Sequence, residues 1–141
     1  DGTLIYKNKK YNELYYESDT EKVKTPDTGF VVEKENVKPF LTEFTSKLGL
    51  VGREQREFIE YWEPRLTKEV KTPYIFISIY DKEEKEIVDH VVITPEPTTR
   101  IEFLAYFKPI AKPYAVEPLD YPVVPERKGF VEVEWGGAID W

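Results

Sequence analysis

The sequence has 141 residues, of which 40% are hydrophobic and 33% charged, a length and composition that predict one folded domain. It contains no cysteine and one histidine, which excludes disulfides, thiol catalysis and cysteine- or histidine-rich metal sites. The net charge of −7 and the scattered basic residues argue against a nucleic-acid partner. No apolar run is long enough to span a bilayer. Methionine is also absent, so we expect a processed chain or part of a longer product.

The first third of the chain predicts a hairpin, a loop, a strand and a helix. Aromatic and β-branched residues flank the polar turn 7–10, a pattern typical of a β-hairpin over 3–17. The polar stretch 18–28 predicts a loop, and 29–32 a short strand. Apolar residues at helical spacing then predict a helix that begins with Asn36 as its N-cap and stops at Gly49.

A second helix is expected from Arg53 onward, and it should end at Pro64 because the residue before proline avoids helical geometry. From Pro73 the hydrophobic period changes to two. Strands are predicted over 74–80 (apolar on both faces, hence central), 88–94, 99–107 and 130–135. The charged stretch 81–86 is expected to connect the first two, either as a loop or as one helical turn. The five prolines of 109–125 predict an irregular surface coil, and the glycine pair 136–137 is expected to break the last strand.

Together these elements predict the α+β class, with an antiparallel or mixed β-sheet and the two helices packed as a pair on one face. We expect a single domain over 1–141, in which 1–70 hold the hairpin and helix pair and 71–141 the sheet-rich half.

Two acidic residues of the last strand, Glu132 and Glu134, are the strongest candidates for chemistry. Residues two apart on a strand share a face, roughly 7 Å apart, so the two carboxylates could bind a cation such as calcium or act on a glycosidic bond. The favoured interpretation is a solvated outer face without a metal, because no calcium-binding loop accompanies the pair. Arg100 is the expected cross-strand partner of one of these glutamates.

Exposed aromatic residues suggest a second kind of site. Tyr15, Tyr16 and Trp141 are candidates for stacking on a sugar or docking a protein, and Trp141 lies beyond the glycine pair. Trp62 shares a helical face with Phe58 and is expected in the core. His90 is expected at the surface, and the sequence predicts no catalytic residue and no cofactor.

Several segments in order along nearly the whole chain resemble an uncharacterised domain of exported bacterial proteins, often Gram-positive. Its marks here are 11–17 (YNELYYE), 29–32 (GFVV), 48–50 (LGL), 57–64 (EFIEYWEP), 93–97 (ITPEP) and 127–137 (RKGFVEVEWGG). Gly52 departs from an Asn-type helix cap and 96–98 from Lys-Pro-Asp in the family pattern. The resemblance implies an extracellular or cell-envelope location and further domains in a longer parent, but no activity.

The expected function is therefore that of a non-catalytic structural or interaction module of a secreted or cell-envelope bacterial protein. Its partner would be another protein or a cell-wall polysaccharide. Two alternatives stay open, a carbohydrate- or wall-binding module and a carboxylate-dependent hydrolase. A cytoplasmic location also stays open, since the absence of cysteine is equally typical there.

Overall fold

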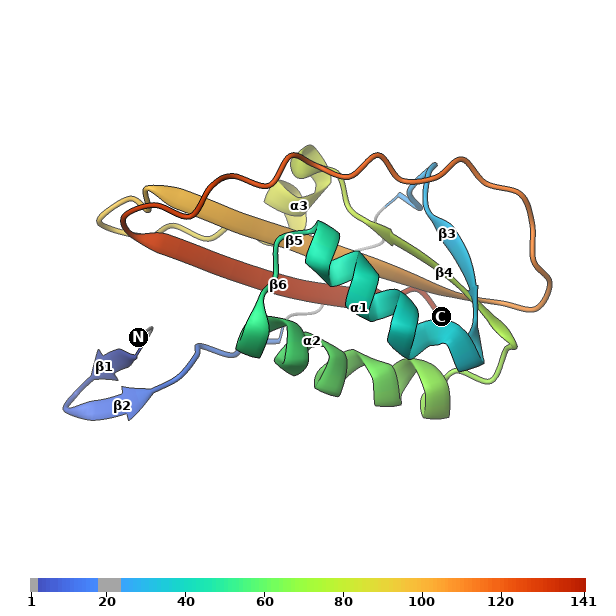
Figure 1. Ribbon diagram of the computed structural model, residues 1–141, viewed down its shortest axis with the longest axis horizontal. Helices are drawn as coiled ribbons and strands as arrows, with labels where there is room; N and C mark the ends of the chain where they lie inside the picture. Colours follow the sequence, from blue (N-terminus) through green and yellow to red (C-terminus); the bar gives the residue numbers. More distant parts are fainter. Residues whose placement is uncertain (1–2, 18–23) are drawn as a thin grey trace.

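A mixed four-stranded sheet forms the centre of the molecule, in a computed structural model that describes residues 3–17 and 24–141 (Figure 1). The strands lie in the order β3-β4-β5-β6, antiparallel except for the parallel pair β5–β6. Their bounds are β3 Phe30–Glu33, β4 Tyr74–Ile79, β5 Thr99–Ile110 and β6 Val131–Ile139. The predicted α+β class and mixed sheet are confirmed.

Two helices, α1 Val37–Lys47 and α2 Gly52–Pro64, lie together across one face of this sheet (Figure 1). The predicted helix pair is therefore confirmed. Gly49 between them has φ +92°, a conformation that favours glycine, and a Cβ there would lie 2.6 Å from Val124. The core between helices and sheet is built from alternate strand residues and the inner helix faces, among them Leu41, Phe58, Ile77 and Phe103.

The opposite face of the sheet carries a second, smaller apolar cluster of Phe76, Tyr80, Leu104 and Tyr106. Burial on both sides makes β4 a central strand, as its sequence predicts. The short helix α3, Lys82–Val88, follows β4 on this second face, and Asp81 caps it by accepting a hydrogen bond from the Glu84 N–H at 2.8 Å.

An N-terminal hairpin stands away from this body. It joins β1 Leu4–Tyr6 to β2 Lys9–Tyr11 in an antiparallel pair, which confirms the predicted hairpin, although its second strand ends at Tyr11. Lys7 and Asn8 both have positive φ, as a two-residue turn of type I′ requires. The loop predicted over 18–28 falls partly on 18–23, which lie outside the described residues.

Five sequence predictions are wrong in detail. Asn36 is the N-cap residue of α1, as predicted, but it also ends a 3₁₀ turn, and its side chain makes no capping hydrogen bond. The α-helix ends at Pro64, as predicted, but Pro64 itself has helical backbone angles and a π-helical turn, Arg65–Glu69, continues from it, so proline does not end the helical chain. The strand predicted over 88–94 is absent. Val88 is the last residue of α3, which forms from the charged stretch, and residues 89–94 form no strand.

The fourth wrong prediction concerns the glycine pair, which lies inside β6 and does not end it. A Cβ on Gly137 would lie 2.7 Å from Cζ2 of Trp62. The glycine therefore lets helix α2 approach the strand closely. The coil predicted over 109–125 is wrong at its start, because Pro109 and Ile110 belong to β5. The rest is confirmed as irregular chain, which runs from the end of β5 back to the start of β6 (Figure 1).

Candidate functional site

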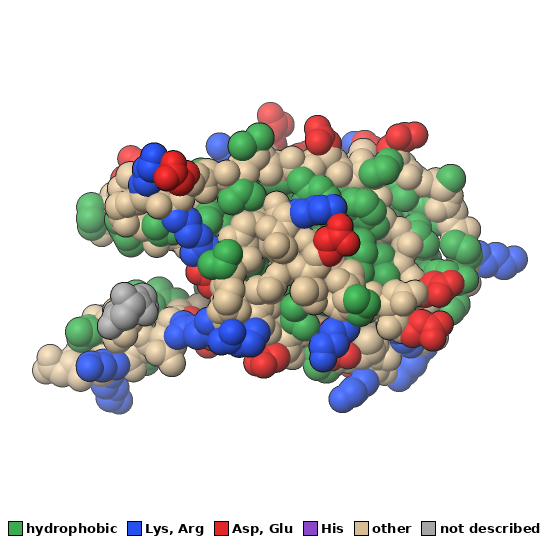
Figure 2. All heavy atoms as spheres, viewed as in Figure 1, with side chains coloured by type: hydrophobic (Ala, Val, Ile, Leu, Met, Phe, Trp, Pro, Cys, Tyr) green, Lys and Arg blue, Asp and Glu red, His purple; other side chains and the backbone are tan. Residues whose placement is uncertain are grey.

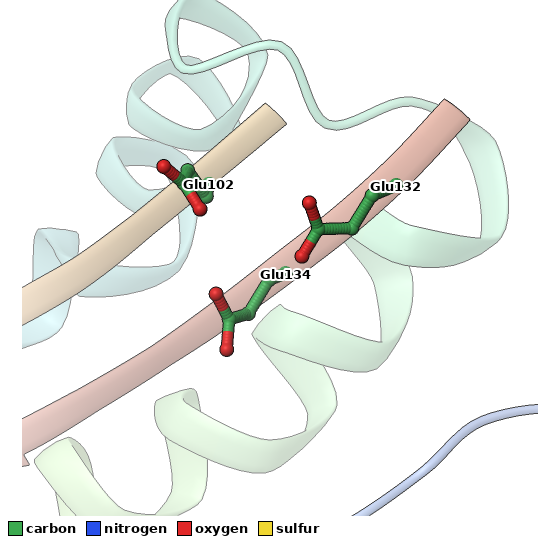
Figure 3. A group of neighbouring side chains, drawn as sticks. All are labelled: Glu102, Glu132 and Glu134. Carbon is green, nitrogen blue, oxygen red and sulfur yellow. The ribbon is translucent and has the colours of Figure 1, made fainter. Parts of the chain in front are cut away.

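Charged side chains gather where β5 and β6 run side by side. The parallel register places Arg100 opposite Glu132 and Glu102 opposite Glu134. Because strand side chains alternate, these four residues share the face away from the helix pair, while the residues between them enter the main core. Figure 3 shows Glu102 coming from one strand and Glu132 and Glu134 from its neighbour.

Lys85 of α3 lies over this acidic group. Its Nζ is 2.9 Å from Oε2 of Glu134 and 3.6 Å from Oε2 of Glu102, and its side chain is 6% exposed. Burial lowers the pKa of Lys85, but the hydrogen bond to Glu134 and the nearby carboxylates raise it more, so the net pKa lies above its ordinary value. Lys85 is therefore a buried cation held between carboxylates.

The predicted cross-strand pair is present. Arg100 Nη1 donates to Glu132 Oε2 at 2.8 Å. The Glu132 side chain is only 8% exposed, and this burial raises its pKa, against the attraction of Arg100. The prediction of a solvated outer face is thus wrong for Glu132, because α3 and Arg100 cover a face that the sequence suggested would be open.

Tyr16 joins the same network from the N-terminal segment. Its hydroxyl donates to Glu134 Oε1 at 2.9 Å and also lies in hydrogen-bond contact with Asp89. Tyr16 as a whole is 54% exposed, but partial burial of its hydroxyl and these two carboxylates raise the pKa of the phenol, which keeps its proton. Through these two contacts of Tyr16, the N-terminal segment 12–17 is hydrogen-bonded to β6 and to the residue that follows α3.

The structure separates the remaining candidates from this network. The Tyr15 hydroxyl contacts Glu17 and, at 3.3 Å, the hydroxyl of Tyr61 on α2. Trp141 follows β6 and is 75% exposed. Trp62 is buried, as predicted. His90 lies at the surface, with Nδ1 2.6 Å from Oε2 of Glu86, a residue one helical turn earlier.

The sequence reasoning missed three members of the network, namely Lys85, Asp89 and Glu102. Glu102 could have been found from strand alternation, since it lies two residues from Arg100 on the same strand. Lys85 and Asp89 could not, because their approach depends on the packing of α3 against β6. The network therefore contains Tyr16, Arg100, Glu132 and Glu134 from the sequence candidates, together with these three.

Carboxylate oxygens of Glu102, Glu132 and Glu134 come within 4.8 Å of one another, a donor set suited to a hard divalent cation. The Lys85 ammonium contacts two of the three carboxylates, and Arg100 contacts the third. A cation entering here would have to compete with two positive charges that the chain itself supplies. The arrangement is that of an internal ion-pair network.

Comparisons of the chain with protein-family models, with curated proteins and with solved structures found no match. Among the residues that the structure describes, no helix has the length and hydrophobicity needed to cross a membrane.

Proposed function

We propose that the chain is a non-catalytic structural or interaction module of a secreted or cell-envelope bacterial protein. The observation that carries this proposal is the position of Lys85, whose ammonium contacts both Glu134 and Glu102. Together with Arg100, it pairs all three grouped glutamates within the chain. Internal ion pairing thus gives this polar cluster a structural use that explains its composition.

The same contacts argue against the alternative of a carboxylate-dependent hydrolase. A glycosidase needs one carboxyl group that donates a proton and a second that attacks or activates water, with the sugar between them. Here Glu134 accepts hydrogen bonds from Lys85 and Tyr16, and Glu132 accepts one from Arg100. Purified wild-type protein should therefore release no reducing sugar from cell-wall polysaccharide. Release that Glu132→Gln abolishes would overturn the proposal.

The location rests on the resemblance to domains of exported bacterial proteins. Fractionation of cells that express the full gene tests it. We expect the parent protein in the envelope or medium, where protease added to intact cells degrades it. A parent found only in the cytosol, without an export signal, would overturn the location.

A wall-binding module stays the second candidate because Trp141 is 75% exposed and offers a ring for stacking. The test is co-sedimentation of the purified protein with peptidoglycan sacculi. Binding that Trp141→Ala removes and Tyr114→Ala retains would favour this candidate, since Tyr114 is 48% exposed and serves as the control. No binding by the wild-type protein would exclude it.

A further inference from the structure

The β1–β2 hairpin, called here the arm, is an apolar and basic projection without a partner surface. Leu4, Ile5 and Tyr6 are 40%, 70% and 62% exposed. Within the described chain, no hydrogen bond or ion pair joins 4–11 to the body, and the nearest anchor is the bond from Arg53 to the Asn12 carbonyl at 2.8 Å. A two-stranded hairpin alone is marginally stable in water, so the arm needs a surface to pack on.

The arm is also the most basic part of a chain with an acidic excess. Its charged side chains are Lys7, Lys9 and Lys10, whereas the whole chain has 27 acidic against 20 basic residues. Figure 2 shows the arm as a separate lobe that carries blue side chains at one end of the molecule. The surface that receives it should be apolar and acidic.

Strand β3 lies toward the other end of the longest axis from the arm (Figure 1). A groove with these properties runs along β3. It holds about 820 Å³, and its charged lining residues are both acidic, Glu33 and Glu43. Its walls are mainly apolar and come from β3, the start of α1 and the proline-rich coil, including Phe30, Pro39, Phe40, Tyr114 and Val116. The groove is thus complementary to the arm in both hydrophobicity and charge.

The groove follows the free edge of the sheet. β3 is the first strand in the order, bonded on one side to β4, and the consecutive residues 29–33 all line the groove. In the part of the chain that the structure describes, the neighbouring coil makes one backbone bond here, from the Gly29 N–H to the Glu117 carbonyl at 2.9 Å. An edge strand of four residues can accept a further strand, and the arm's strands have three residues each.

We propose that the arm of one copy of this chain binds in the β3 groove of a second copy, adding a strand to its sheet. The proposal rests on the function proposed above and names the partner of that interaction module. Arm and groove lie at opposite ends, so a copy cannot fill its own groove. The contact is head-to-tail and leads to closed rings or open chains.

Sedimentation velocity on the purified chain over a range of concentrations tests the proposal. We expect wild-type protein to form dimers and larger species, and both Lys9→Glu/Lys10→Glu and Glu33→Lys/Glu43→Lys to weaken association by at least about tenfold. Because Glu43 also pairs with Lys47 at 2.7 Å, Glu33→Lys alone should account for much of the groove effect. Lys82→Glu/Lys128→Glu, which changes the same charge elsewhere, should associate like wild type.

Mixing the two charge-reversed proteins makes the test specific. The acidic arm of one variant then meets the basic groove of the other, and the unchanged basic arm of the second meets the unchanged acidic groove of the first. We therefore expect association to return as dimers and larger species in which the two variants alternate. A wild-type chain that stays monomeric, or association that survives both reversals, would overturn the proposal. Neither result bears on the proposed function, which fractionation and the polysaccharide assay test. The proposed self-association can therefore fail while the proposed function holds.

Discussion

Gly137 of β6 lies against the indole of Trp62 on α2, so close that a Cβ would stand 2.7 Å from Cζ2 and 3.0 Å from Phe107. Side chains do not tolerate that approach without displacement of buried rings. The absence of a side chain at 137 thus sets how closely the helix pair packs on the sheet.

Gly137→Ala should therefore destabilise the protein, by about 1–3 kcal/mol, as overpacking does in other cores. Gly136→Ala is the matched control. Its Cβ would lie 3.0 Å from the flexible end of Leu104, which can move aside, so the loss should be smaller. Urea unfolding of both variants measures the difference, and equal stability would contradict the packing argument.

The bidentate pair of Arg127 and Glu54 fastens the proline-rich coil to the helix pair. Arg127 donates to both Glu54 oxygens, at 2.8 and 2.6 Å, and to the Gly49 carbonyl at 2.9 Å. Burial raises the pKa of Glu54, but Arg127 and the Val51 N–H lower it more, so the net pKa lies below its ordinary value. A carboxyl group with a lowered pKa stabilises the fold above its ordinary pKa and loses this effect as pH falls through the folded value.

Glu54→Gln should therefore cost about 1 kcal/mol at neutral pH, a modest figure because both partners are partly exposed. The difference from wild type should shrink below about pH 4.5, as the wild-type carboxylate is protonated. Glu60→Gln on the same helix is the control, with an expected change under about 0.5 kcal/mol. A pH-independent cost for Glu54→Gln would refute the electrostatic explanation.

The Tyr16 hydroxyl should hold the N-terminal segment to the body. Tyr16→Phe removes one hydrogen-bonding group worth about 1 kcal/mol, so amide exchange over residues 12–17 should rise about fivefold. Tyr11→Phe is the control, because no hydrogen bond reaches the Tyr11 hydroxyl among the described residues. Hydrogen–deuterium exchange with mass spectrometry measures both, and unchanged exchange in Tyr16→Phe would mean that other contacts hold the segment.

Truncation of two tryptophans should affect the free energy of unfolding very differently. Trp62 is 6% exposed and packs against Phe58 and Phe107, so Trp62→Ala should cost about 3–5 kcal/mol. Trp141 is 75% exposed, and Trp141→Ala should change stability by less than about 0.5 kcal/mol. Thermal unfolding compares them, and a large loss at Trp141 would show that the C-terminal ring is part of the core.

The periodic part of the fold could be predicted from the sequence. The 3.6-residue period around Leu41 and Phe58 and the two-residue period around Ile77 each record which face is buried. The helix pair follows from the need to cover one apolar face of the sheet, and the apolar residues on the other face of β4 predict that this face is covered as well.

Local signals failed where tertiary packing opposed them. Pro64 lies in a helical conformation that the following π-helical turn continues. Gly137 has the composition of a strand breaker in the sequence, but in the fold it makes room for the indole of Trp62. The charged run containing Lys85 resembles a solvated connection, and only the position of α3 over β6 shows that this lysine is buried against Glu134.

The free energy of unfolding of Glu134→Gln, in a double-mutant cycle with Lys85→Met, most directly tests whether the charged network is structural. We predict that each single variant is destabilised, by about 3 kcal/mol for Lys85→Met, and that the two residues couple by more than about 1 kcal/mol. Residues kept for binding or catalysis often reduce stability, and their removal can increase it. A Glu134→Gln protein more stable than wild type, with no coupling to Lys85, would contradict the structural role and favour a functional site.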